Sequence, residues 1–271
     1  MRFGKAVLAV LSLIRWENAL LSVAGVVLGA WAAGRPNQPE TIVMAAVAVL
    51  LAAFANADND VCDYAIDRVV HPERPLPSAA LSLHAARVVV GIAASAALIF
   101  SALLGAAETL AVVGVIAAMT LYNRGVKAHG VPGNVIVAVV ASLPFVFGAW
   151  SAGSARAGLP LFLVGIPLHF AREIAKDLDD AQGDAAYRRT LPLRVGARAA
   201  RLVVVSSVAL FVVALAPFAV RWPVFAIVVL PAVALCLLAA RRVLSGQRGT
   251  ARLLKSAMVV AMVAFVFSAR W

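Results

Sequence analysis

The feature that most constrains this chain is a series of apolar runs that recurs from one end of the sequence to the other. Each run holds about 16 to 22 apolar residues and is bounded by charge, Pro or Gly. In the hydrocarbon of a bilayer every backbone N–H and C=O must be hydrogen-bonded within the protein, so runs of this length form helices. Hydrophobic residues make up 63% of the chain, which is outside the range of a soluble globular domain. The sequence therefore predicts an all-α, polytopic membrane protein.

We expect nine membrane-spanning helices. The predicted spans lie near residues 8–33, 41–57, 85–105, 107–122, 133–151, 158–174, 200–220, 222–240 and 254–269. Alternate connections carry most of the positive charge, since 20 of the 24 Lys and Arg fall in the N-terminal segment and four loops, at 58–87, 123–132, 172–201 and 241–255. Because cytoplasmic loops carry an excess of Lys and Arg, the N-terminus is predicted inside and the C-terminus outside.

The net charge of +11 would suggest a nucleic-acid partner if it formed a patch on a soluble domain. Here the positive residues flank apolar spans, so we interpret them as anchors that face anionic lipid. Cys62 and Cys236 lie in different settings and offer neither a disulfide framework nor a CxxC metal site. The expected partner is therefore the lipid bilayer, with no nucleic acid and no obligate protein partner.

The acidic residues are gathered in two places, with ten of the thirteen carboxylates in two predicted cytoplasmic loops. On a helix, Asp60, Asp63 and Asp67 lie within about 60° of one another and Asn56 falls in the same arc. These four residues form the first acidic stripe. The second acidic stripe repeats that spacing 117 residues later with Glu173, Asp177, Asp180 and Asp184. Asp58 and Asp179 point off the stripes and are expected to be solvated or to cap helices.

A similar tail follows each stripe, RPLPS at residues 74–78 and RTLPL at 189–193. The recurrence of stripe and tail indicates an internal duplication, or two half-sites built to one chemical requirement. We therefore expect a single domain, 1–271, with two acidic halves at about 1–150 and 151–271. His71, His84 and His129 are expected at the loop surface.

Carboxylates stacked on one helix face repel one another, and Mg²⁺ relieves that repulsion. This ion takes one or two carboxylates and shares its remaining positions with water and substrate phosphate oxygens. The acids of a single stripe often only cap a helix or face solvent at a helix end. Two stripes of one spacing on one membrane face favour a site that holds two or more Mg²⁺ around a diphosphate, with Arg and Lys nearby.

The segment NDVCDYAID at residues 59–67, followed by HPERPLPS at 71–78, resembles the first aspartate motif of the UbiA superfamily of intramembrane prenyltransferases. REIAKDLDDAQGD at 172–184, with Thr190 to Pro192 and Gly196, resembles the second. YNRGVKAHGVPGN at 122–134 resembles the family's Tyr/Lys segment, and Arg15 with Asn18 matches its first-helix signature. The resemblance covers essentially the whole chain.

This resemblance implies Mg²⁺-dependent transfer of a prenyl group from an allylic prenyl diphosphate, in a helix bundle around a central apolar cavity open to the cytoplasmic face. The implied metal ligands are Asn56, Asn59, Asp60, Asp63, Asp67, Asp177, Asp180 and Asp184. The implied diphosphate contacts are Arg74, Lys127 and Arg189, with Arg68 and Lys176 behind them. Tyr122 is placed near the reacting carbon, and Arg15, Asn18, Asn134 and His169 are candidates for the acceptor side of the cavity. Topological anchoring for Lys127, a solvated loop charge for Arg74 and an interfacial position for Tyr122 are the alternatives.

The acceptor is the least constrained part of the prediction. The form of the second motif and the compact chain resemble family members that prenylate geranylgeranylglyceryl phosphate, with geranylgeranyl diphosphate as donor, in ether-lipid synthesis. An aromatic acceptor of quinone biosynthesis, of the 4-hydroxybenzoate or dihydroxynaphthoate type, is the alternative. Arg15, Arg172 and Arg194 are candidates for contact with an acceptor phosphate.

A cation transporter is a remote alternative, because acidic residues inside a membrane can mark an ion path. A transporter would place its acids near the bilayer midplane, whereas these acids lie at the ends of predicted spans. It would also have no need of the Arg-Pro tails or of the Tyr122 and Lys127 segment. The sequence therefore favours a prenyltransferase that acts at the cytoplasmic face.

Overall fold

The computed structural model describes residues 2–185 and 188–268, without the side chains of residues 2, 3 and 184. Within these ranges the chain is all-helical, as predicted, and contains no strand. The helices are α1 (Arg2–Ile14), α2 (Trp16–Ala32), α3 (Pro39–Cys62), α4 (Tyr64–Val70), α5 (Leu83–Ala102), α6 (Ala106–Arg124), η1 (Val126–His129), α7 (Val131–Ser151), α8 (Ala155–Asp184), α9 (Leu191–Val195), α10 (Ala197–Ala214), α11 (Ala216–Arg221), α12 (Pro223–Val228), α13 (Leu230–Leu244) and α14 (Thr250–Val266).

Each predicted span coincides with a helix or a pair of helices. In the described part of the chain, seven helical segments are long and apolar enough to cross a membrane, or eight if the bent α1–α2 pair counts as one span. The ninth predicted span coincides with α14, which is 17 residues long and is not among those segments. The multi-pass membrane architecture is thus supported, and the count of nine stays a prediction.

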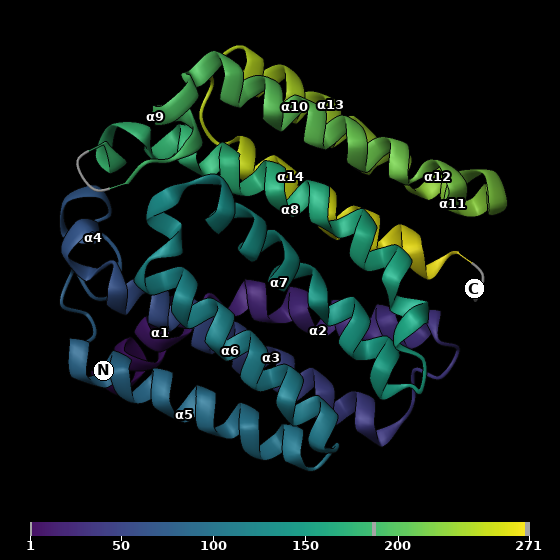
Figure 1. Ribbon diagram of the computed structural model, residues 1–271, viewed down its shortest axis with the longest axis horizontal. Helices are drawn as coiled ribbons and strands as arrows, with labels where there is room; N and C mark the ends of the chain where they lie inside the picture. Colours follow the sequence, from purple (N-terminus) through teal and green to yellow (C-terminus); the bar gives the residue numbers. More distant parts are fainter. Residues whose placement is uncertain (1, 186–187, 269–271) are drawn as a thin grey trace.

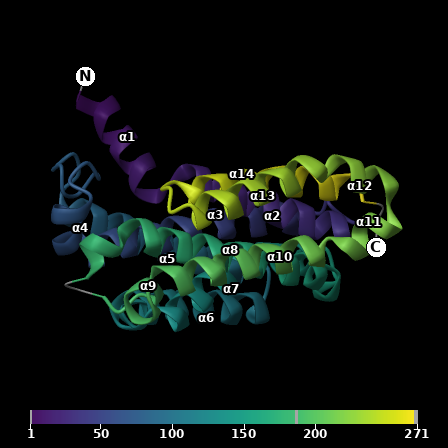
Figure 2. The same cartoon turned by 90° about the horizontal axis from the view of Figure 1, so that it is seen from above.

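The first predicted span, 8–33, is divided at Arg15, where α1 and α2 meet at an angle of 54°. Arg15 has a backbone φ of 51°, in the left-handed region that residues other than Gly rarely adopt. Its guanidinium contacts the Asp60 carboxylate at 2.7 Å, and this ion pair offsets the cost of the strained backbone. Figure 2 shows α1 leaving the rest of the bundle at this bend. Hydropathy could not predict the break, because it depends on a partner 45 residues away.

The helices pack around two main hydrophobic cores. One is formed chiefly by α8, α10, α13 and α14, and the other by α3, α5, α6 and part of α7. In Figure 1, α2 and α7 lie between these two groups. Large apolar side chains also face outward, with Ile42 75% and Leu110 72% exposed. Outward apolar side chains of this size suit a lipid environment.

The polar ends of the long helices lie together. In Figure 1, α4, α9 and the end of α8 are on one side of the bundle, and α11 and α12 are on the opposite side. The short helix α4 contacts α8 directly, which brings the two acidic stripes to one end of the molecule.

Candidate active site

A cavity of about 1030 Å³ lies inside the bundle. Carboxylate, amide and basic side chains line one end of it, and apolar residues that include Leu51, Met119, Phe145 and Phe265 line the remainder. On α8 the lining runs from Leu161 to Asp180, a length of about 28 Å at the rise of an α-helix. The cavity thus combines a charged end with a long apolar chamber, as a ligand with a charged head and a hydrocarbon tail requires.

The first acidic stripe is buried at the charged end. Asp60, Asp63 and Asp67 are each only 3% exposed. The predicted continuous helix is interrupted here, because α3 ends at Cys62 and α4 begins at Tyr64. Asp63 and Asp67 line the cavity, whereas Asp60 lies behind the lining. Helical hydrogen bonds continue through this break, since the N–H of Asp63 donates to the Asn59 carbonyl and the N–H of Asp67 to the Asp63 carbonyl.

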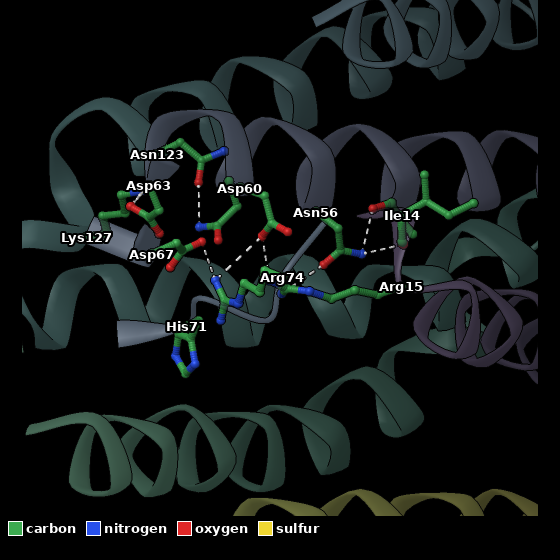
Figure 3. Close-up of polar contacts among 12 residues, drawn as sticks. Ile14, Arg15, Asn56, Asp60, Asp63, Asp67, His71, Arg74, Asn123 and Lys127 are labelled. Carbon is green, nitrogen blue, oxygen red and sulfur yellow. Dashed lines mark hydrogen bonds and ion pairs between the residues drawn. The ribbon is translucent and has the colours of Figure 1, made fainter. Parts of the chain in front are cut away.

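Basic side chains neutralise the buried carboxylates, as their burial requires. Arg15 lies 2.7 Å from Asp60, and Arg74 lies 2.6 Å from Asp67 and 3.7 Å from Asp60; Figure 3 shows these contacts. Burial raises the pKa of the Asp67 carboxyl, and the Arg74 guanidinium opposes that shift. Arg74 is therefore an internal partner of the stripe rather than a solvated loop charge.

Asp63 is the meeting point of two basic groups from distant segments. Its oxygens lie 2.6 Å from Lys127 Nζ and 2.7 Å from an Arg188 guanidinium nitrogen. The backbone N–H of Arg189 donates to the carbonyl of Ala128 at 2.9 Å, which joins the segment before α9 to η1. A Cβ at Gly130, whose φ is +75°, would lie 2.6 Å from the Arg189 carbonyl oxygen. Glycine at this position therefore permits the close approach that brings Lys127 and Arg188 to one carboxylate.

The second acidic stripe faces the first across the cavity. Asp177 and Asp180 line it, and Asn134 of α7 donates a 2.8 Å hydrogen bond to Asp177. His71 lies 3.8 Å from Asp180 and lines the cavity too, so the expectation of a loop-surface position for His71 is wrong. Asp184 is the last residue of α8, and its side chain lies outside the described part of the structure. Glu173, one turn deeper, contacts Arg172 at 3.1 Å and Lys176 at 2.6 Å.

The amides predicted as metal ligands differ in their surroundings. The Oδ1 of Asn56 accepts from Arg15 at 3.3 Å, and its Nδ2 donates to the carbonyls of Ile14 and Ala52. Asn59 lines the cavity and donates its Nδ2 to Asn123 at 3.1 Å. No hydrogen bond from the described residues reaches Asn59 Oδ1, which leaves that oxygen for a ligand.

Asp58 supports Asn59 from behind. It is only 6% exposed and accepts a 2.7 Å hydrogen bond from Asn123 Nδ2, while Asn123 Oδ1 accepts from Asn59. The expectation that Asp58 is solvated or caps a helix is therefore wrong, because the end of α6 covers it. Asp179 does cap a helix, since it accepts a 3.0 Å hydrogen bond from the N–H of Gly249, the N-cap of α14.

Asn123→Leu is expected to destabilise the protein by about 1–3 kcal/mol, the cost of leaving a buried acceptor unsatisfied. Asp58 would lose the hydrogen bond that it accepts in a buried position. Thermal unfolding of the purified protein in detergent measures the change. Asp58→Leu in the same background should restore part of the lost stability, because it removes the buried carboxylate. An Asn123→Leu midpoint equal to that of the wild type would contradict this account.

The remaining predicted residues divide into two groups. Cavity-lining positions are held by Arg15, Asn18, Asn56, Tyr122, Lys127, His169 and Lys176. Arg68 and Arg189 are exposed and do not line the cavity, whereas Arg188 does. The sequence analysis missed Arg188, although the adjacent arginine pair was the signal that could have indicated it.

Among the residues that the structure describes, no group of three or more His, Cys, Asp or Glu side chains converges to hold a metal ion. Each carboxylate of the first stripe instead contacts a basic group. This arrangement suits Mg²⁺, which takes only one or two carboxylates and completes its shell with water and substrate oxygens.

Comparison with known proteins places the chain among membrane enzymes. A model of the UbiA prenyltransferase family matches residues 7–267. The digeranylgeranylglyceryl phosphate synthase of Methanopyrus kandleri is 33% identical over 274 residues, which cover 96% of this chain and 98% of that protein. The synthase of the same name from Halobacterium salinarum strain R1 is 35% identical and covers 94% of each chain. A solved structure of a UbiA homolog from Archaeoglobus fulgidus, bound to GPP and Mg²⁺, shares the fold with a TM-score of 0.72 at 18% identity and covers 96% of this chain and 98% of that one.

Proposed function

The chain belongs to the UbiA prenyltransferase family, and from that premise we propose that it transfers a geranylgeranyl group to geranylgeranylglyceryl phosphate. The observation that carries this proposal is similarity over nearly the whole chain to proteins named digeranylgeranylglyceryl phosphate synthase. The cavity supports it, because its charged end suits a diphosphate and its long apolar part suits a prenyl chain. The chain is thus assigned to the enzymes that transfer alkyl groups other than methyl.

The residues at the charged end fit Mg²⁺, with which the Archaeoglobus homolog was solved. Their donor atoms are hard oxygens, and the buried Oδ1 of Asp63 has the Lys127 ammonium as its contact at 2.6 Å. We propose that Asn59, Asp63 and Asp67 hold metal on one side and that Asp177, Asp180 and Asp184 hold it on the other, with Asn56 and Asp60 in support. Bound Mg²⁺ would neutralise charge on the diphosphate oxygens and so assist their departure. We expect two or more ions.

The chain's own cations take the remaining charge of the diphosphate. Arg74, Lys127 and Arg188 each contact an acid of the first stripe, so they stand where a diphosphate bound beside those acids can accept their hydrogen bonds. Guanidinium and ammonium groups fixed at the leaving group stabilise the charge that develops there. Arg189 and Arg68, which are exposed, are proposed only as outer contributors to the positive potential.

The reaction breaks the bond between the first prenyl carbon and the diphosphate oxygen. The acceptor hydroxyl oxygen forms the new ether bond to that carbon, and its proton leaves with the released diphosphate. The apolar lining excludes water from the allylic cation that develops, and we place Tyr122, which lines the cavity, near the reacting carbon. A well-developed cation needs no strong base to accept a hydroxyl.

A panel of acceptors tests the proposal directly. Purified protein with Mg²⁺ and labelled geranylgeranyl diphosphate should prenylate geranylgeranylglyceryl phosphate, and not 4-hydroxybenzoate or dihydroxynaphthoate. Chelation of Mg²⁺ should stop turnover, and added Mg²⁺ should restore it. Transfer to an aromatic acid alone would overturn the proposed acceptor and leave the family assignment intact.

We further propose that nine helices span the cell membrane, with the N-terminus and the active site at the cytoplasmic face and the C-terminus outside. The distribution of Lys and Arg supports this topology. Cysteine labelling from either side of the membrane tests it. In a background with the exposed Cys62 replaced by Ser, a cysteine introduced at exposed Arg198 should react only from the cytoplasmic side, and one at Arg156 should react only from outside.

A further inference from the structure

A second charged cluster lines the same cavity and takes no part in the chemistry proposed above. It contains Arg172, Glu173 and Lys176 of α8, Arg252 and Lys255 of α14, and Glu17 of α2. Lys176 lies 2.6 Å and Arg172 3.1 Å from the same Glu173 oxygen, and Lys255 lies 2.7 Å from Glu17. We call these six residues the basic cluster.

The basic cluster borders the second acidic stripe on α8, because Lys176 is four residues from Asp180 and Glu173 is four residues from Asp177. Arg172 and Lys176 are four residues apart and therefore share a helix edge. Asp177, which bonds Asn134 of α7, is rotated from Lys176 by about 100° and from Arg172 by about 140°. In Figure 1 α14 runs beside α8, with which it is in contact, and its Arg252 and Lys255 line the cavity as well. The cavity thus has an acidic wall toward α3 and α7, and the basic cluster adjoins this wall on the side of α14.

The charges of the basic cluster do not cancel. Four cationic groups stand against two carboxylates, which leaves two positive charges. Glu173 accepts from both Arg172 and Lys176, so it fixes the two cations close enough for one anion to reach both. The Nε of Arg172 is buried and has no hydrogen-bond partner among the described residues. A buried donor without a partner at a cavity wall is costly to leave unsatisfied, and this one points to an anionic ligand.

The charge and the position favour a phosphate monoester. A phosphate monoester carries about −1.5 to −2 charges at neutral pH, which matches the excess of the cluster, whereas a carboxylate carries only one. The diphosphate is already assigned to the acidic wall, where Mg²⁺ can bridge to it. Because Arg74, Lys127 and Arg188 already contact the acids there, we assign an anion at the basic cluster to the second substrate.

We propose that the basic cluster binds the phosphate of the acceptor lipid, with Arg172 and Lys176 as its principal contacts and Arg252 and Lys255 completing the site. This inference rests on the proposed function, since it names the subsite that would select a phosphorylated acceptor. It reassigns Lys176 from support of the diphosphate to recognition of the acceptor. The acceptor hydroxyl, which lies on the carbon next to the one that bears the phosphate, is then held beside the acidic wall where the prenyl carbon reacts.

Kinetics with two acceptors test the inference. Full-length protein in detergent, with Mg²⁺ and geranylgeranyl diphosphate, is assayed with geranylgeranylglyceryl phosphate and with geranylgeranylglycerol, which lacks the phosphate. Arg172→Gln and Lys176→Gln should each raise the KM for the phosphorylated acceptor about tenfold to a hundredfold, the range for one lost charge-assisted hydrogen bond. The KM for geranylgeranyl diphosphate should change less than twofold. The preference for the phosphorylated over the unphosphorylated acceptor should fall by the same factor as the KM rises.

Two further variants keep the test decisive. Arg252 is exposed, so Arg252→Gln should fold normally, and we expect its KM for the phosphorylated acceptor to rise about threefold to tenfold. Arg198→Gln, an exposed charge on α10 outside the cavity lining, is the matched control and should behave as the wild type.

The outcomes separate the two proposals. An equal rise in the KM for geranylgeranyl diphosphate would return these residues to the diphosphate site and overturn the inference. An equal loss with both acceptors would show a structural role and would also overturn it. If the wild type prenylates an aromatic acid and not geranylgeranylglyceryl phosphate, the proposed function itself is wrong.

Discussion

Asp63→Ala and Asp180→Ala are each expected to lower kcat/KM for prenyl transfer by about a thousandfold or more, the scale for loss of a preorganised charge-stabilising group. Asp63 is buried, lines the cavity and is contacted by both Lys127 and Arg188. Its removal would take away a proposed metal oxygen and leave two cations without their shared counter-charge. Asp180 lines the opposite wall, so the two variants test the two proposed metal groups independently.

The matched control for this prediction is the neighbouring carboxylate. Asp179 is one residue from Asp180 on α8 but bonds the N–H of Gly249 instead of facing the ligand. Asp179→Ala should lose the stability of one helix cap, about 1 kcal/mol, and keep its activity within about threefold. Size-exclusion chromatography in detergent reports whether each variant is folded, and product formation from labelled prenyl diphosphate reports activity. More than a tenth of wild-type activity in a folded Asp63→Ala or Asp180→Ala protein would defeat the proposal of two metal groups.

Much of the fold could be predicted from the sequence, because the length and hydropathy of one continuous segment indicate whether it forms a membrane-spanning helix. A run of apolar residues is long enough to span or it is not, and the helices fall where the predicted spans lie. The acidic stripes were also visible, since their spacing is a property of one helix. Asp63, Asp67, Asp177 and Asp180 line the cavity because each stripe lies at the end of a span.

The errors share one physical cause, which is that partners distant in the chain decide the local detail. Arg15 breaks the first span because Asp60 and Asn56 bind its guanidinium from α3. Asp58 is buried because Asn123 of α6 covers it. The spacing of residues along a single helix contains no information about these contacts with other helices.

The choice between two adjacent arginines is the sharpest case of that limit. The family resemblance implied Arg189 for the diphosphate, and this residue also opens the RTLPL tail that parallels RPLPS. In the structure the backbone N–H of Arg189 is held by the Ala128 carbonyl and its side chain is exposed. Arg188 reaches Asp63 at 2.7 Å with a side chain that is 20% exposed. Of these two adjacent residues, Arg188 therefore lies in the cavity and Arg189 lies outside it.

Arg188→Gln is accordingly expected to lower kcat/KM about a hundredfold, the scale for loss of one charge-assisted contact to a leaving group in a largely buried site. Arg189→Gln removes the same charge one residue away and keeps the backbone hydrogen bond, so it should retain activity within about threefold. Each purified variant is assayed over a range of prenyl diphosphate concentrations, and Arg188→Lys shows how much depends on the planar guanidinium rather than on charge alone. If Arg189→Gln is the impaired variant and Arg188→Gln is not, the parallel between the two tails is the better guide to the diphosphate, and Arg188 serves only to neutralise Asp63.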